Sequence, residues 1–151
     1  MAFKSSLSFR LVKGEDLNHH GTLFAGRCAE WFVESGFVAV AAFLNTKNIV
    51  CLKIHGMEFL YPIHSGDVLA FDSRVVRAGK TSLSVYIKVY EQKKVDDIFS
   101  EGFITFCHVD DRTRPIPHNI TLVADTPEEK NLQQEAKNLL AYISKNRKSD
   151  Q

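Results

Sequence analysis

The chain has 151 residues, 44% of them hydrophobic and 25% charged, with 19 lysines and arginines against 18 aspartates and glutamates. This size and composition fit one compact domain, and the near-neutral balance excludes a bulk electrostatic attraction to nucleic acid or to an anionic membrane. No apolar run approaches the ~20 residues that span a bilayer, and the first residues lack the apolar stretch of a secretion signal. We therefore expect a cytoplasmic protein with neither nucleic-acid nor membrane partners.

The first part of the chain predicts a strand, a polar turn and a long helix. In SLSFRLV, Leu7, Phe9 and Leu11 alternate with polar residues, which is the period-two pattern of a half-buried strand. After the turn KGEDLNHHG, the segment from about Gly26 to Leu44 has no proline and is long enough for about five helical turns. Apolar residues occupy nearly every face of this segment, so we expect an enclosed helix rather than one on a surface.

Four strand-like stretches follow, separated by turn residues. They are IVCLKIHGMEFLY, which Pro62 closes, GDVLAFDSRVVRAG, TSLSVYIKVYEQ and DIFSEGFITFCHVD. We expect a twisted antiparallel meander whose inward face is covered by the apolar helix, which makes the fold class α+β.

The tail of the chain, after Pro127, predicts an amphipathic C-terminal helix over about residues 127–148. Its apolar residues at helical spacing are Leu132, Ala136, Leu139, Leu140 and Ile143. Such a helix either docks on the outside of the domain or frays, and we assign it no chemistry.

Two glutamates, Glu30 and Glu34, interrupt the apolar helix. A carboxylate that loses its hydration by burial has a raised pKa, toward the range useful for a general base. The alternative is a partly solvated ion-pair cluster, because Arg27, Glu30 and Glu34 are spaced i, i+3 and i+7 along one face. We assign the base to Glu34 and a pairing with Arg27 to Glu30, which lies nearer the polar turn.

Three motifs occur in order along the chain: NHHGTLFAG over residues 18–26, then FLYPIHSGDVL, then AGKTSLSVYIKV. They resemble the N-x-x-G-x-x-F/H-G-G turn, the F-x-x-P-x-x-x-G-D stretch and the G-x-T-S strand of hotdog-fold acyl-CoA thioesterases, the acyl-CoA hydrolase family. The resemblance covers about residues 7–118. It implies a hotdog fold, in which an antiparallel β-sheet wraps around one long central helix, as a single domain over residues 1–151.

The same resemblance implies hydrolysis of a fatty acyl-CoA to a free acid and CoA, with no cofactor beyond the coenzyme A that the substrate carries. In that family two subunits join their sheets edge to edge, and the active sites lie at the dimer interface. We therefore expect a homo-oligomer that is at least a dimer, with a hexamer as the higher alternative.

Thioester hydrolysis needs a base or nucleophile and donors for the oxyanion that develops on the carbonyl. The first amides of a helix have no internal partner and lie at its positive end, so the N–H of Gly26, with Ala25 beside it, suits that oxygen. The alternative is that Gly26 only lets the helix pack against the sheet. Asn18 and Thr22 are expected to position the carbonyl and the water, whereas their structural alternatives are to hold the turn and to cap the helix.

The remaining substrate contacts are expected from the same turn and from a second one. The resemblance assigns His20, Phe24 and Ala25 to the substrate-binding turn. Arg77 and Lys80 flank a glycine turn, and clustered cations near a turn suit the CoA phosphates, although a solvated surface is the alternative. The predicted residues of this second turn are Arg77, Gly79, Lys80, Thr81 and Ser82.

Departures from the family pattern support a rival function. Many relatives carry a carboxylate on the helix where this chain has Val33, and one branch has Asp or Asn in place of Thr22. The rival is a hotdog protein that binds acyl-CoA without turning it over. A dehydratase or hydratase of the same fold is a third option, but the catalytic histidine of a G-F-P turn is absent.

Histidines and cysteines offer two further alternatives. His19 and His20 are adjacent and point differently, and no third ligand has metal-site spacing, so we expect no metal. Cys28 near the helix start is conceivable as a nucleophile but is expected to be a small core residue. An odd number of cysteines in no framework spacing suits reduced thiols.

Overall fold

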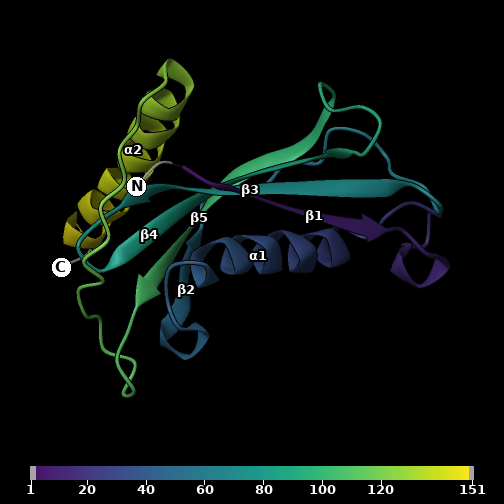
Figure 1. Ribbon diagram of the computed structural model, residues 1–151. Helices are drawn as coiled ribbons and strands as arrows, with labels where there is room; N and C mark the ends of the chain where they lie inside the picture. The colour runs from purple at the N-terminus through teal and green to yellow at the C-terminus, as the bar shows by residue number, and fades with distance from the viewer. Residues whose placement is uncertain (1–2, 150–151) are drawn as a thin grey trace.

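An antiparallel sheet of five strands curves around one long helix (Figure 1). The computed structural model describes residues 3–149, with side chains through residue 141. Residues 1–2 and 150–151, which we also assign to the domain, lie outside the described part. The strands are β1 (Ser5–Leu11), β2 (Ile49–Ile54), β3 (Val68–Ala78), β4 (Ser82–Glu91) and β5 (Ile98–His108), in the spatial order β1-β3-β4-β5-β2. The helices are α1 (Ala25–Ala41) and α2 (Pro127–Ser149), with short 3-10 turns η1 (Gly14–Asp16) and η2 (Thr46–Asn48).

The expected α+β class, with a sheet around a central helix, is therefore confirmed. The meander is formed by β3, β4 and β5, whereas β2 turns back to pair with the far side of β5. Both β1 and β2 are consequently edge strands, each with one unpaired side.

The strand β1 turns its apolar side away from α1, which is the reverse of what its alternation suggests. Leu7, Phe9 and Leu11 are 50%, 48% and 54% exposed. The opposite side carries Arg10, whose guanidinium lies 5.7 Å from the centre of the Trp31 ring of α1. Because this cation packs on α1, the polar side of β1 faces the helix and the apolar side faces outward.

The strand β2 is shorter than the predicted stretch, which extended to Tyr61. It ends at Ile54, and the chain then follows β5 through only two backbone hydrogen bonds, from His55 N–H to the Phe103 carbonyl (2.8 Å) and from Leu60 N–H to the Phe99 carbonyl (3.0 Å). Gly56 lies between them at φ +134°, a conformation that favours glycine and interrupts the regular ladder.

The core lies between the concave face of the sheet and one side of α1. Cys28, Phe32 and Val40 of the helix are fully buried there. The opposite side of α1 carries Glu30, Glu34 and Val38, of which Val38 is 56% exposed. The expectation of an enclosed helix is thus wrong for this stripe, because within one chain the sheet covers only one side of the helix. The helix also ends at Ala41, three residues before the predicted Leu44.

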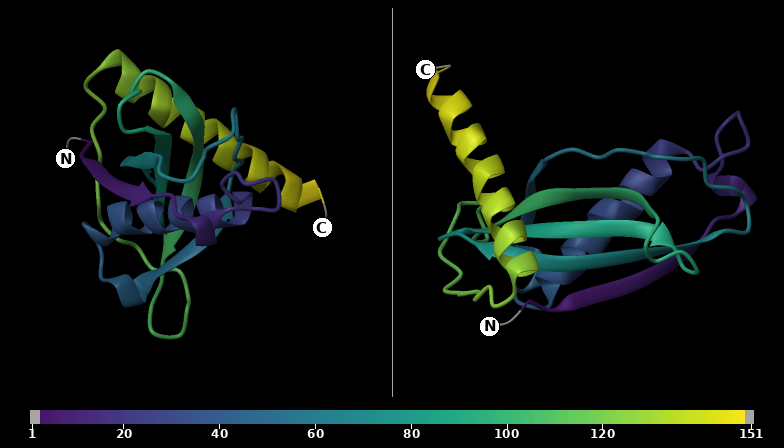
Figure 2. Two further views of the ribbon diagram at one scale, coloured as in Figure 1. Left: turned by 90° about the vertical axis from the view of Figure 1, so that its right-hand side faces the viewer. Right: turned by 90° about the horizontal axis from the view of Figure 1, so that it is seen from above.

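The predicted C-terminal helix is confirmed and packs on the outer face of the sheet. Ala136 of α2 is buried against Val76 and Phe103, and the Gln133 side-chain amide donates to the Val76 carbonyl (3.3 Å). The helices α1 and α2 therefore lie on opposite faces of the sheet (Figure 2). Leu132 and Leu139 join the contact, whereas the side chain of Ile143 lies outside the described part. No helix among the described residues is long and apolar enough to cross a bilayer.

Candidate functional site

Asn18 organises the turn that leads into α1. Its side-chain carbonyl accepts hydrogen bonds from the N–H groups of His20 (2.9 Å) and Thr22 (3.2 Å), and its amide group donates to the Thr22 hydroxyl (3.1 Å). Gly21, within this loop, has φ +80°. Asn18 thus holds the turn, the structural role that its residue type favours. Thr22 does not cap the helix, because the N-cap is Phe24 and no side chain caps it.

The start of α1 presents two free amides. The N–H groups of Arg27 and Cys28 both donate to the Phe24 carbonyl, at 3.0 and 3.1 Å. The N–H groups of Ala25 and Gly26 donate no hydrogen bond among the described residues. They lie at the positive end of a helix of 17 residues, so this end is suited to hold a carbonyl oxygen or an oxyanion.

The glycine at position 26 is explained by its surroundings. The three nearest atoms to a Cβ at Gly26 would all belong to the Phe24 ring, with Cε1 at 2.6 Å, Cζ at 3.0 Å and Cδ1 at 3.3 Å. A side chain here would therefore crowd the Phe24 ring beside the two free amides. The alternative that Gly26 serves helix packing against the sheet stays a prediction.

A buried acid anchors the turn below these amides. The Asp16 side chain is only 5% exposed, forms an ion pair with Nε of Arg27 (3.1 Å) and accepts a hydrogen bond from Lys13 N–H (2.9 Å). The Phe24 N–H donates to the Asp16 carbonyl (2.9 Å). Asp16 is a supporting residue that the sequence analysis missed, because an acid in a polar turn gives no sign of burial. Arg27 also pairs with Glu30 (3.1 Å), which confirms the pairing predicted for that glutamate.

Glu34 lies on the exposed stripe of α1. Its side chain is 61% exposed and forms an ion pair with Arg10 of β1, with 2.9 Å between Arg10 Nη2 and Glu34 Oε2. The burial predicted for this carboxylate is therefore wrong for the single chain. Its neighbour Val33, about 100° around the helix, packs against the core. The role of Glu34 as a base stays a prediction.

Helix geometry relates these side chains to the free amides. At 100° and 1.5 Å per residue, Glu30 is displaced by about 40° and about 6 Å from Gly26, whereas Glu34 is displaced by about 80° and about 12 Å. Val33 lies within about 20° of Gly26, on the same face. Within one chain Glu30 is the nearer carboxylate, and Glu34 is too far along the helix to reach a carbonyl held at Gly26.

The turn between β3 and β4 ties its carbonyls back and leaves its donors free. The Lys80 carbonyl accepts from His118 N–H (3.3 Å), the Thr81 carbonyl from His108 N–H (2.7 Å), and the Ser82 carbonyl from Gly79 N–H (2.8 Å). In the part of the chain that the structure describes, no partner is found for the amides of Lys80 and Thr81, for the hydroxyls of Thr81 and Ser82, or for the Arg77 and Lys80 cations.

Arg77 and Gly79 shape this turn further. The Arg77 guanidinium is partly buried, and its pKa is lowered by that desolvation. A Cβ at Gly79 would lie 2.6 Å from the Ser82 hydroxyl oxygen and 3.1 Å from Nη1 of Arg77. The glycine thus leaves room for a guanidinium and a hydroxyl to converge. Free amides, hydroxyls and cations on one turn form a concavity suited to a phosphate.

Apart from Glu34, the predicted site residues fall into two groups that one chain does not bring together. The first, at the start of α1, contains Asn18, His20, Thr22, Phe24, Ala25 and Gly26. The second is the β3–β4 turn. Since Leu11 pairs with Val68, α1 starts near the beginning of β3. The turn lies at the other end of this 11-residue strand, ten steps of about 3.3 Å or about 33 Å away. Figure 1 shows the two groups at opposite ends of the molecule.

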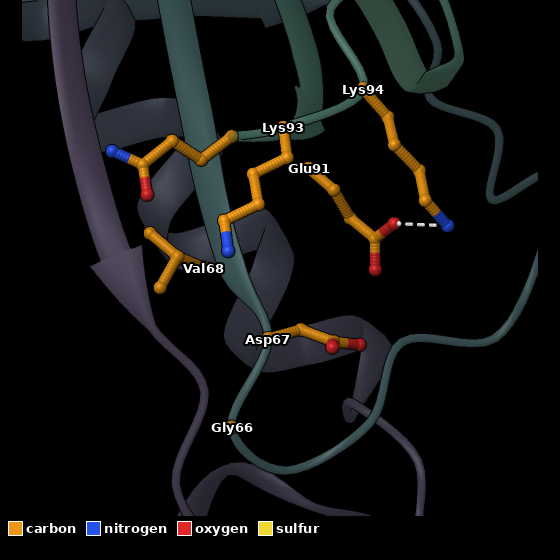
Figure 3. Close-up of a pocket in the computed structure, with 7 residues that line it drawn as sticks. Gly66, Asp67, Val68, Glu91, Lys93 and Lys94 are labelled. Carbon is orange, nitrogen blue, oxygen red and sulfur yellow. Dashed lines mark ion pairs between the residues drawn. The ribbon is translucent and has the colours of Figure 1, made fainter.

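The surface hollow around the start of β3 and the end of β4 does not connect these groups. The hollow in Figure 3, of about 290 Å³, is lined by charged residues around the start of β3 and the end of β4. Its Glu91 and Lys94 form an ion pair (3.1 Å), and Asp67 accepts a hydrogen bond from His64 N–H. A hollow with this lining is not suited to an acyl chain.

The other chemical candidates have structural explanations. The rings of His19 and His20 lie 3.9 Å apart, and among the described residues no three His, Cys, Asp or Glu side chains gather as a metal site requires. Cys28 is fully buried, and burial raises the pKa of its thiol to about 12. The thiol therefore stays protonated at neutral pH, as suits the core residue that was expected.

Comparison with known proteins gives one family and several close folds. Residues 20–97 match the sequence family described as the thioesterase superfamily. The acyl-CoA thioester hydrolase YciA of Salmonella typhimurium is 28% identical over 118 residues, which cover 71% of this chain and 86% of YciA. The protein YkhA of Bacillus subtilis, named an uncharacterized acyl-CoA thioester hydrolase, is 27% identical over 105 residues, 68% of this chain but only 60% of YkhA.

Two solved structures superpose over nearly the whole chain. A hexameric acyl-CoA thioesterase, solved without ligand, has 27% identity and a TM-score of 0.83, with 94% of this chain and 92% of that one covered. An acyl-CoA hydrolase from Bacillus cereus also has 27% identity and a TM-score of 0.83, with 97% and 89% covered. These superpositions confirm the predicted hotdog fold.

Proposed function

The chain belongs to the thioesterase superfamily, and from this premise we propose that it is an acyl-CoA thioester hydrolase that releases a free fatty acid and CoA. The observation that carries the proposal is the pair of unpartnered amides of Ala25 and Gly26 at the start of α1. Such donors stabilise the charge that develops on a thioester carbonyl oxygen during attack. The names of the similar proteins agree with this activity.

The proposed reaction uses the residues of the turn and the helix. The carbonyl oxygen of the thioester accepts hydrogen bonds from the N–H groups of Ala25 and Gly26. Asn18 and Thr22 position the carbonyl and the water. Glu34 accepts a proton from the water while the water oxygen bonds to the carbonyl carbon. The C–S bond then breaks, and the leaving CoA thiolate takes up the proton that Glu34 accepted, which restores the carboxylate. Because Glu34 lies about 12 Å along α1 from Gly26, we assign it to a carbonyl held by the same amides of a second subunit.

A homo-oligomer supplies that second subunit. The edge strand β2 exposes Leu52 and Ile54, and two copies of β2 can pair antiparallel about a two-fold axis. That axis reverses the direction of the second sheet, so the β3–β4 turn of one subunit lies at the same end as the α1 start of the other. One CoA can then reach the free amides with its thioester and the turn residues from Arg77 to Ser82 with its phosphates. We propose a dimer of this kind, with a hexamer, as named for one similar structure, as the higher assembly.

Binding of acyl-CoA without turnover is the second candidate function. One observation favours it: both glutamates of α1 are exposed and form ion pairs with arginines, Glu30 with Arg27 and Glu34 with Arg10. The helix face that continues from Gly26 carries Val33, which has no proton to exchange. The phosphate-binding turn and the free amides would serve a binding protein equally well.

Measuring thiol release from a panel of acyl-CoAs separates the two functions. Turnover that is abolished in Glu34→Gln and retained in Glu30→Gln would support the assignment. If Glu30→Gln is the inactive variant, the assignment of Glu34 as the base is wrong, although the protein is still a thioester hydrolase. Tight acyl-CoA binding by the wild type with no thiol released above background would establish the binding protein instead.

A further inference from the structure

His118 joins the segment after β5 to the β3–β4 turn through both edges of its ring. Its Nε2 lies 2.9 Å from the Ser82 carbonyl oxygen, and its Nδ1 lies 3.0 Å from the backbone nitrogen of Ile120. The His118 N–H also donates to the Lys80 carbonyl (3.3 Å). One residue therefore holds two of the three carbonyls of the turn in place.

These contacts select one form of the imidazole. The Ile120 N–H can only donate, so Nδ1 of His118 must be unprotonated to accept it. The Ser82 carbonyl can only accept, so Nε2 must carry the proton. The neutral ring is thus the only form that satisfies both bonds. Asn119, between the two bonded residues, has φ +58°, a conformation that asparagine tolerates well and that turns Ile120 N–H back toward the ring.

His108 provides an internal contrast. Its Nδ1 lies 3.1 Å from the Ile116 carbonyl oxygen, so this nitrogen donates, and the bond persists when the ring is protonated. The two rings are 6.4 Å apart. His108, from the end of β5, is the titratable group whose ring contacts that of His118, and Lys80, from the turn, meets His118 through its backbone carbonyl. Within the described residues no carboxylate forms an ion pair with either imidazole.

We propose that His118 is a positioning residue for the phosphate-binding turn and that protonation of its Nδ1 releases the turn. A proton on Nδ1 places two donors against each other, His118 Nδ1–H and Ile120 N–H, so the ring must leave this position. The Ser82 carbonyl then loses the Nε2 bond and keeps only the bond from Gly79 N–H. The Lys80 carbonyl is then held by a His118 backbone whose ring no longer anchors it to the turn, so the turn loosens around the bound anion. The inference depends on the proposed function, in which this turn binds the CoA phosphates.

Binding of free CoA, measured by calorimetry on the intact oligomer at pH 7.5 and 5.5, tests the proposal. We expect wild-type affinity to fall about tenfold at pH 5.5, the effect of about one lost hydrogen bond. His118→Gln keeps a side-chain donor for Ser82 without a titrating ring, so its affinity should stay within about threefold across the same range. His118→Phe should bind CoA about tenfold more weakly at both pH values.

Two comparisons isolate the role of the ring. His108→Gln should keep the wild-type acid dependence, because the bond that His108 makes survives protonation. The CoA phosphate also titrates in this range, so the acid effect is taken as the difference between wild type and His118→Gln with the same ligand. A substrate that ends at pantetheine carries no nucleotide phosphates, so its hydrolysis should be unchanged in His118→Phe, while KM for the acyl-CoA rises.

Three results would overturn the inference: equal acid dependence in wild type and His118→Gln, full affinity in His118→Phe, or an acid effect abolished by His108→Gln. If His118→Phe does not fold, the first and third comparisons still decide. Failure of the proposed function looks different, because a wild type that neither binds CoA nor releases thiol shows no signal for any variant to change.

Discussion

Replacing Gly26 by alanine tests the oxyanion role, because the structure predicts opposite effects on stability and activity. A methyl group would lie 2.6 Å from Cε1, 3.0 Å from Cζ and 3.3 Å from Cδ1 of Phe24. The Phe24 side chain is 55% exposed, so its ring can rotate away at small cost. A helix favours alanine over glycine by about 0.5–1 kcal/mol. The free energy of unfolding should therefore stay constant or rise by up to about 1 kcal/mol.

Activity should fall in the same variant. Either the methyl group or the displaced Phe24 ring lies beside the free amides, where the thioester carbonyl is expected. Loss of one oxyanion donor lowers kcat by about 10²–10³ in other enzymes, and crowding that lengthens both hydrogen bonds should lower kcat/KM at least about tenfold. The assays are thiol release from an acyl-CoA and urea denaturation of the same preparations.

Gly36→Ala is the matched control on the same helix. Its Cβ would meet the buried side chains of Ile87 at 3.1 Å, Phe106 at 3.4 Å and Ile104 at 3.5 Å, far from the helix start. Overpacking of this kind costs about 1–3 kcal/mol, so this variant should lose stability and keep kcat/KM below its unfolding transition. Full activity in Gly26→Ala, or a loss of more than about 1 kcal/mol in its stability, would refute the reasoning.

Three further predictions concern the groups around α1. Asp16→Asn removes a buried carboxylate from its partly exposed arginine and should lower the unfolding free energy by about 2 kcal/mol in urea denaturation; a loss under about 0.5 kcal/mol would contradict the anchoring role. Arg10→Met breaks an exposed pair with Glu34 and should change stability by less than about 1 kcal/mol, which thermal denaturation at low and high salt can check. The raised pKa of Cys28, about 12, means that the unfolded chain releases this proton first, near pH 9. Stability should therefore fall as pH rises from about 9 toward 12, and Cys28→Val should flatten that part of a denaturation series, whereas an unchanged slope would count against it.

Local patterns predicted the elements well but not the directions in which their side chains point. Alternation marked β1 as a strand, yet it could not tell that Arg10 would turn inward to meet Trp31 and leave Leu7 and Phe9 outside. The composition of α1 indicated burial, but a sheet wraps only one side of a helix, so Glu34 and Val38 remained uncovered. Which side is covered depends on the order of the strands, which no local window contains.

The candidate site shows the same division. Asn18, Thr22 and Gly26 are close in sequence, and the structure places the first two in one turn and Gly26 in the first residues of α1 that follow it. The separation of this turn from Arg77 depends on the direction of β3 and was not visible in the motifs. His108 and His118 were missed because they bind backbone carbonyls. Every residue has a backbone carbonyl, so such contacts leave no pattern in the sequence. Only Asn119, a residue type tolerant of positive φ, hinted at the tight bend that brings His118 into place.

The place of β1 at the edge of the sheet matters while the protein is being made. Its last residue, Leu11, pairs with Val68, which is 57 positions later (68 − 11), and Ser5 pairs with Arg74, 69 positions later (74 − 5). At about 5–20 residues per second, a ribosome needs roughly 3–14 seconds to synthesise the intervening chain. Throughout that delay Leu7, Phe9 and Leu11 leave the exit tunnel without a neighbouring strand, which makes this segment a natural substrate for chaperones that capture apolar nascent peptides.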